Sequence, residues 1–225
     1  MVESMRNVDL ATMRSIFNER FNSIIEGRLF FTMEEPFEDL LRRTGALLEG
    51  DFVLTSGLRS SHYVQCALTL QHPKYAEGLG GCLADRFRDY TVDAVISPAV
   101  GGLIIGHETA RALGARAIFA ERENGAMTLR RGFALQPGER VLIVEDVITT
   151  GGSVRELIRL VEASEATVVG VGAILDRSGG TVDLGVLLRP LLTMQMPTYE
   201  PDAYPLRQQG SSPVKPGSRQ QETGG

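Results

Sequence analysis

The chain has 225 residues, of which 43% are hydrophobic, and this suits one domain with a packed core and short appendages. Its formal net charge of −5 argues against broad nucleic-acid binding, and no apolar run approaches the roughly 18 residues that span a membrane. The N-terminus lacks an apolar signal core and two cysteines make no disulfide framework, so we expect a cytoplasmic protein with reduced thiols.

Composition divides the chain into three regions. Residues 1–32 are expected to form an N-terminal extension with at most a short helix. A single domain is expected over 33–207, where strand and helix patterns are clear. Residues 208–225 are rich in Gly, Ser, Gln and Pro, which predicts a flexible tail.

The first half of the domain predicts helices separated by extended chain. Apolar residues from Phe37 to Leu48 have helical spacing, which predicts an amphipathic helix ending near Gly50. Residues 52–70 favour two extended pieces around a Ser-Gly turn, and 76–90 favour a second helix.

From residue 92 onward, apolar strands alternate with helices. Strands are predicted over 92–97, 116–120, 141–145 and 167–175, helices over 102–113 and 154–163, and a polar loop over 121–132. This alternation predicts an α/β domain with a parallel sheet covered on both faces. Ligands bind such sheets at the carboxyl ends of their strands. Distinctive segments follow at these ends, over 97–102, 121–132, 145–153 and 176–180, which indicates a single site.

The strongest functional signal follows the apolar run at 141–144. Two carboxylates, Glu145 and Asp146, precede a hydroxyl- and glycine-rich turn that leads into a predicted helix. Backbone N–H groups at a helix N-terminus bind phosphate, and glycines let the backbone approach it closely. The carboxylates would repel a bare phosphate, but they suit the hydroxyls of a sugar that carries one, with a metal ion nearby. The pattern therefore predicts a sugar-phosphate site.

Residues 145–153 resemble the phosphoribosyl pyrophosphate (PRPP) motif of type I phosphoribosyltransferases. Three other segments are similar to those of the orotate-specific members: 52–63 to the segment that covers the base, 97–102 to the pyrophosphate turn, and Asp176-Arg177 to the pair whose arginine meets orotate. The resemblance implies the type I phosphoribosyltransferase fold, a central, mainly parallel sheet flanked by helices with a small hood of N- and C-terminal segments.

The resemblance also implies an activity: transfer of the ribosyl 5-phosphate group from PRPP to orotate, in pyrimidine biosynthesis. It implies three catalytic residues, Glu145, Asp146 and Arg122. It implies PRPP binding by Glu145, Asp146, Val147, Ile148, Thr149, Thr150, Gly151, Gly152, Ser153, Val100, Gly101 and Arg122. Orotate contacts are implied for Thr149, Arg177, Tyr63 and Val64. Mg²⁺ would be held mainly through PRPP without a dedicated protein ligand, and the enzyme would be a homodimer.

The polar loop departs from the family pattern. It contains neither lysine nor histidine, and Lys74 and Lys215 are the only lysines of the chain. Arg122 stands where the family usually has a loop lysine, and an arginine can clamp an anion but cannot readily give up a proton. Two alternatives therefore stay open: a phosphoribosyltransferase for another base, such as a purine, and a non-catalytic regulator that senses PRPP.

Overall fold

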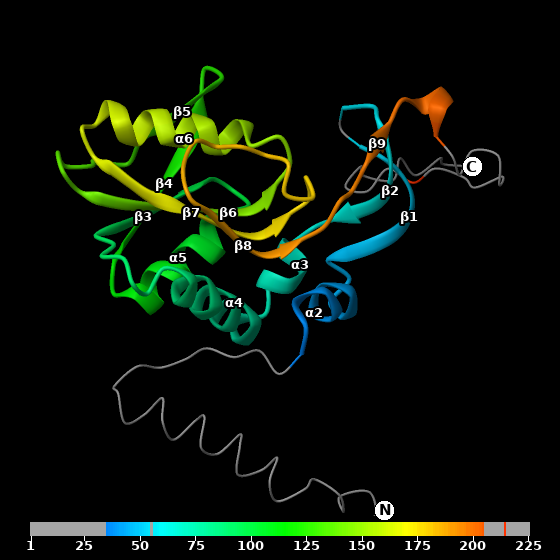
Figure 1. Ribbon diagram of the computed structural model, residues 1–225, viewed down its shortest axis with the longest axis horizontal. Helices are drawn as coiled ribbons and strands as arrows, with labels where there is room; N and C mark the ends of the chain where they lie inside the picture. Colours follow the sequence, from blue (N-terminus) through cyan, green and yellow to red (C-terminus); the bar gives the residue numbers. More distant parts are fainter. Residues whose placement is uncertain (1–34, 55, 205–213, 215–225) are drawn as a thin grey trace, which may run out of the picture. The chain divides into compact units, whose positions relative to one another are not determined.

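The computed structural model describes residues 35–54, 56–204 and 214 (Figure 1). The predicted extension over 1–32 lies outside the described residues, as does the predicted tail apart from Val214. The larger sheet has the strand order β5-β4-β3-β6-β7-β8. Its strands are β3 (Ala94–Pro98), β4 (Arg116–Glu123), β5 (Ala126–Leu129), β6 (Arg140–Ile148), β7 (Thr167–Asp176) and β8 (Leu188–Thr193). All neighbours are parallel except β4 and β5.

Helices cover both faces of this sheet, as predicted. Helix α6 (Gly152–Ala163) packs on β3, β5, β6 and β7, whereas α4 (Pro73–Arg86) and α5 (Leu103–Leu113) lie on the opposite face (Figure 1). Among the described residues, no helix has the length and apolar character that a membrane crossing requires.

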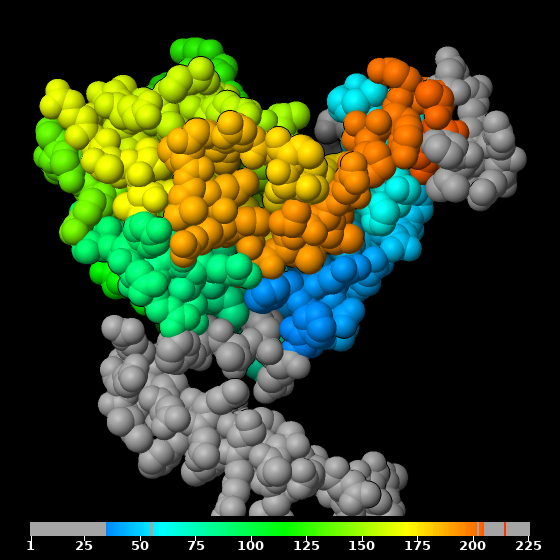
Figure 2. Space-filling model, in the orientation of Figure 1, coloured from blue at the N-terminus to red at the C-terminus, as the bar shows by residue number. Residues whose placement is uncertain are grey.

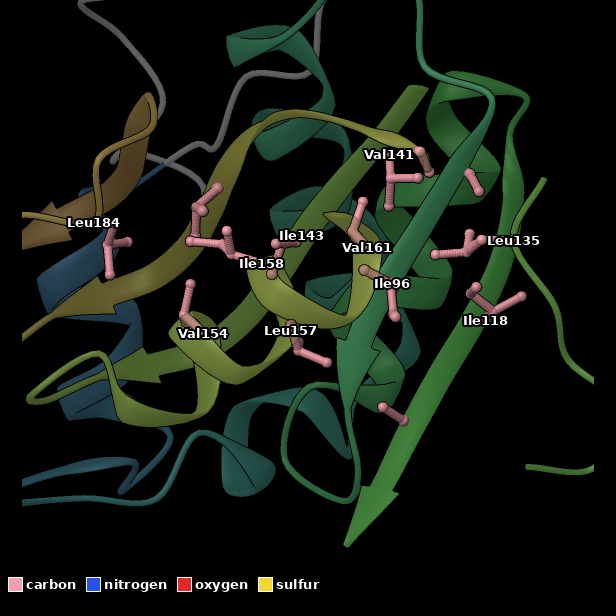
Figure 3. Close-up of a cluster of buried hydrophobic side chains, with 14 of the residues drawn as sticks. Ile96, Ile118, Leu135, Val141, Ile143, Val154, Leu157, Ile158, Val161 and Leu184 are labelled. Atoms are coloured by element: carbon pink, nitrogen blue, oxygen red, sulfur yellow. The ribbon is translucent and has the colours of Figure 1, made fainter. Parts of the chain in front are cut away.

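The core beneath α6 explains why the apolar run of β6 forms a buried strand. Val154, Leu157 and Val161 of α6 are almost fully buried and face Ile96 and Ile143 of the sheet (Figure 3). Burying each such side chain stabilises the fold by roughly 1.5–3 kcal/mol. These buried side chains hold α6 against the sheet, so the helix starts at the carboxyl end of β6, where the functional turn lies.

The opposite face is shaped by glycines in β7. A Cβ atom at Gly170 would lie 2.8 Å from Cε1 of Phe87, and one at Gly172 would lie 3.3 Å from Cε2 of the same ring. Phe87, at the end of α4, is fully buried in this space. The two glycines therefore let α4 approach the sheet closely.

A smaller antiparallel sheet has the order β1-β2-β9. It consists of β1 (Leu47–Val53), β2 (Arg59–Val64) and β9 (Thr198–Tyr199), with α2 (Phe37–Arg43), α3 (Ala67–Leu70) and the 3₁₀ turn η1 (Pro201–Ala203) nearby in sequence. A largely buried ion pair joins Arg59 to Asp51, and the guanidinium lies 5.0 Å from the ring centre of Tyr204. The predicted hood of N- and C-terminal segments is confirmed.

Two predictions for the first half of the domain were wrong. Helix α2 ends at Arg43 rather than near Gly50, because Gly45 adopts the left-handed φ of 72° and the Thr44 hydroxyl bonds to the Leu40 carbonyl. The chain from Leu47 onward is strand. Residues 67–70 form the short helix α3 instead of extended chain.

The predicted loop over 121–132 is instead mostly a β-hairpin. Strand β4 continues to Glu123, and β5 pairs with it antiparallel after a two-residue turn. Asn124 and Gly125 have φ values of 51° and 86°, as a type I′ hairpin turn requires. Strands β8 and β9 were not predicted.

Candidate active site

Two carboxylates end the buried part of β6. Glu145 is 8% exposed and Asp146 is half-buried. The Asp146 N–H donates to Glu145 Oε1 at 3.0 Å, and the Val147 N–H donates to Asp146 Oδ1 at 2.9 Å. Burial, followed by the neighbouring Asp146 carboxylate, raises the pKa of Glu145 well above its usual range. A nearby cation, or the hydroxyls of a bound sugar, would favour the ionised form of this pair.

The turn after β6 presents backbone to solvent at the start of α6. Thr149 and Thr150 are exposed, and Gly151, the N-cap, has a φ of 76°. A Cβ atom at Gly151 would also lie 2.8 Å from Leu184 Cδ2. Both the left-handed φ and this close contact therefore favour glycine here. The free N–H groups of the first helical turn make this a suitable phosphate cradle.

Arg155 holds the turn in place, and the sequence reasoning missed it. Its Nη1 donates to the Thr150 carbonyl at 2.5 Å and its Nη2 donates to the Asp183 carbonyl at 2.7 Å. The sequence did contain a signal for Arg155. The helix dipole disfavours a cation in the first turn of a helix, so an arginine there indicates that its side chain makes a specific local contact. Arg155 therefore links the turn to the segment before β8.

The turn after β3 lies against the acid pair. A Cβ atom at Gly101 would be only 2.8 Å from both carboxylate oxygens of Asp146. The Ala99 N–H donates to the Ala120 carbonyl at 2.8 Å, which ties the start of the turn to β4, and Val100 is 79% exposed. Residues that the sequence assigned to pyrophosphate and to ribose are therefore neighbours.

A cavity of about 580 Å³ opens beside the β6–α6 turn. It brings together all four residues that the sequence assigned to the base: Tyr63, Val64, Thr149 and Arg177. The remaining lining residues are Val53, Leu54, Ser56, Leu58, Thr150, Ser178, Met196 and Thr198. The hood contributes a mainly apolar wall, whereas the β6–α6 turn and the end of β7 contribute hydroxyls and a cation.

Arg177 lines this cavity from the end of β7, where hydrogen bonds to Asp176 hold the following loop in place. The carboxylate of Asp176, which is 1% exposed, accepts the N–H groups of Ser178 and Gly180 at 2.9 and 3.1 Å. The Arg177 Nη2 atom is buried and has no hydrogen-bond partner among the described residues. Burial also lowers the pKa of the Arg177 guanidinium. An unpaired buried donor is costly, and an anion bound beside Arg177 in the cavity that it lines would satisfy it.

None of the three predicted catalytic residues, Glu145, Asp146 and Arg122, is among the residues that line this cavity. Arg122 pairs with α6 instead. Its Nη2 and Nη1 donate to Glu156 of α6 at 2.6 and 3.1 Å, and Nη1 also donates to the Gly125 carbonyl at 2.7 Å. The hairpin is thereby held against α6.

The chain is similar to known phosphoribosyltransferases. The phosphoribosyl transferase domain model matches residues 69–184. An orotate phosphoribosyltransferase of Pelotomaculum thermopropionicum is 57% identical over 180 residues, which cover 80% of this chain and 95% of the relative. One from Thermotoga maritima is 52% identical, over 81% and 97% of the two chains.

Solved structures agree with this similarity. The crystal structure of orotate phosphoribosyltransferase from Aeropyrum pernix matches with a TM-score of 0.58 and 29% identity, over 70% of this chain and 93% of that one. The adenine phosphoribosyltransferase from Rhodothermus marinus matches with a TM-score of 0.57 and 21% identity, over 70% and 99%, which shows a shared fold alone.

Proposed function

Because the chain belongs to the orotate phosphoribosyltransferases, within the type I phosphoribosyltransferase family, we propose that it transfers the ribosyl 5-phosphate group of PRPP to orotate. The products are orotidine 5′-monophosphate and pyrophosphate, in pyrimidine biosynthesis. One observation carries the proposal at the site: the buried, unpaired Nη2 of Arg177 belongs to a residue lining the same cavity as Thr149 and Thr150.

The sugar and its phosphate would bind at the end of β6. Glu145 and Asp146 would accept hydrogen bonds from the ribose 2′- and 3′-hydroxyls. The turn over Val147–Ser153 would hold the 5′-phosphate through backbone N–H groups and hydroxyls. The Arg155 bonds to Thr150 and Asp183 support this role, because they preorganise the turn before the phosphate arrives.

The pyrophosphate would lie over Val100 and Gly101. The site fits Mg²⁺ carried with PRPP, because the acid pair supplies the oxygen donors that Mg²⁺ prefers. No group of three or more His, Cys, Asp or Glu side chains in the described ranges could cage a metal. Mg²⁺ generally binds through few protein carboxylates and keeps several waters, so substrate oxygens and water would complete its shell. When bound, Mg²⁺ would neutralise part of the pyrophosphate charge.

The base would occupy the cavity under the hood. Arg177 would pair with the orotate carboxylate, and a planar guanidinium can do so with two hydrogen bonds. Thr149 would contact the base from the phosphate turn, and Tyr63 and Val64 from the hood. The reaction then needs little acid–base work from the protein: the bond from C1′ to the pyrophosphate oxygen breaks as orotate N1 adds from the opposite face, and the N1 proton is lost to the departing pyrophosphate or to solvent. Positioning and charge stabilisation supply the catalysis.

Arg122 is proposed as an electrostatic clamp for pyrophosphate. Its side chain is 48% exposed in the pair with Glu156. An ion pair this exposed contributes only about 0–1 kcal/mol, so a highly charged substrate could draw the arginine away at small cost.

We also propose a homodimer in the cytoplasm. Val100 is 79% exposed and Ile104 45% exposed, although both are large apolar residues next to the site, and a second copy could cover them. Cys66 is buried and free, which fits a reducing compartment.

The test is a panel of bases incubated with the protein, PRPP and Mg²⁺, with pyrophosphate release as the readout. We expect release with orotate and none above background with adenine or xanthine. Turnover with a purine but not with orotate would favour another phosphoribosyltransferase. PRPP binding without turnover of any base would favour a non-catalytic sensor.

A further inference from the structure

The β1–β2 hairpin has C-terminal residues on both of its edges. On one edge, β9 pairs with β2, with Tyr199 opposite Arg59. Figure 2 shows the orange C-terminal residues beside the cyan residues of the hairpin. On the other edge, Val214 forms a parallel bridge to Phe52. Two backbone hydrogen bonds make this second contact: the Val53 N–H donates to the Val214 carbonyl at 2.9 Å, and the Val214 N–H donates to the Asp51 carbonyl at 2.8 Å.

The Val214 contact falls where the hairpin is weakest. The β1–β2 register shifts between Glu49 and Phe52, so the ladder between the two strands is interrupted there. A two-stranded hairpin has marginal stability by itself, and each added strand contact strengthens it. Val214 thus supports the distal part of β1 directly beyond the irregularity.

That distal part, together with the hairpin tip, forms one wall of the base cavity, lined by Val53, Leu54 and Leu58, which we call its roof. Val53 is the residue whose N–H is bound by Val214, whereas Leu54 and Leu58 belong to the hairpin tip. The Leu54 N–H donates to the Leu58 carbonyl at 2.8 Å, so the tip follows β1 as a unit. Any loosening at Val53 therefore acts first on the roof, because the two bonds of Val214 reach β1 and not the β6–α6 turn.

We propose that Val214 is a positioning residue for the base cavity, acting by strand addition to the edge of β1. The contact works through the backbone, because the Val214 residue is 56% exposed. It keeps the hairpin tip in the geometry that closes over the base. The inference rests on the proposed function only for the identity of that base.

Kinetics of the full-length Val214→Pro variant test the proposal, with Val214→Thr as the matched control. Proline removes the N–H that bonds to Asp51, whereas threonine keeps it along with the β-branched shape. Losing one or two backbone hydrogen bonds lowers the ratio of closed to open hairpin by about threefold to tenfold. We expect the KM for orotate to rise measurably in Val214→Pro, by up to that factor, the KM for PRPP to stay within about twofold, and Val214→Thr to match the unmodified chain.

Amide hydrogen exchange at Val53 gives a second readout that needs no turnover. Exchange should be at least about threefold faster in Val214→Pro than in Val214→Thr. Unchanged exchange, or equal increases in both KM values, would overturn the role of Val214, and so would equal effects of the two variants. If the unmodified chain fails to turn over orotate, the proposed function fails, and the exchange comparison alone then decides whether Val214 holds the roof.

Discussion

Replacing Arg177 by methionine should move stability and activity in opposite directions. The unliganded protein leaves the buried Nη2 atom without a partner in the described part of the chain. An unsatisfied buried donor costs about 1–3 kcal/mol, and methionine keeps much of the packed stem. We therefore expect the free energy of unfolding to rise by about 1 kcal/mol, which raises the Tm by about 2–4 °C in a protein of this size.

The same change removes the charged partner of the orotate carboxylate. A charge-assisted hydrogen bond contributes about 1.5–3 kcal/mol, so kcat/KM for orotate should fall by about 10-fold to 150-fold. The KM for PRPP should change little, because the acid pair and the phosphate turn stay intact.

Thermal unfolding and steady-state kinetics with each substrate varied in turn measure both effects. Arg159→Met, which removes a cation from the exposed face of α6, controls for net charge and should leave kcat/KM unchanged. A lower Tm in Arg177→Met, together with equal losses for both substrates, would refute the reasoning and make Arg177 a structural residue.

Three further predictions concern the turns and the sheet. Gly101→Ala places a methyl group 2.8 Å from the Asp146 carboxylate oxygens, so the KM for PRPP should rise about tenfold or more, and an unchanged KM would show that this turn yields freely. The pKa of Glu145 is raised from 4.5 to about 9, so the folded protein holds this proton more tightly than the unfolded chain and the free energy of unfolding falls as pH rises through that window. Glu145→Gln should flatten this fall between about pH 5 and pH 9 in urea unfolding, and an identical slope would contradict the assignment. Gly170→Ala places a methyl group 2.8 Å from the Phe87 ring and should cost about 1–3 kcal/mol of stability in the same assay, with both KM values unchanged.

The central sheet was largely predictable from sequence, whereas the hood was not. The strands over 94–98 and 167–176 contain apolar runs that are buried on both faces. Short apolar runs of this kind are typical of the inner strands of a parallel sheet, so the sequence predicted them well. The segment 46–50 fits helical and strand spacing alike, and the left-handed Gly45 and the pairing with β2 decide for strand. Strand β9 has only two residues and exists because β2 lies beside it, which no local pattern reveals.

The candidate site shows the same division. Its turns were predicted because strand ends carry local chemistry, and the residues assigned to the base do meet around one cavity. The bond from Arg155 to the Asp183 carbonyl was missed because it depends on tertiary placement. The bonds that the Asp176 carboxylate accepts from the following loop are local in sequence, and they were missed because many other turns would fit the same residues. Arg122 was assigned to the site from its position in a loop, but the hairpin that it belongs to places it on Glu156.

A binding comparison of orotidine 5′-monophosphate with uridine 5′-monophosphate tests the central claim most directly, since the two nucleotides differ only in the carboxylate that Arg177 is proposed to bind. Calorimetry should show that the unmodified protein binds the carboxylated nucleotide at least about tenfold more tightly, and that Arg177→Met binds both equally. Equal affinities in the unmodified protein, or a preference that survives in Arg177→Met, would contradict the account.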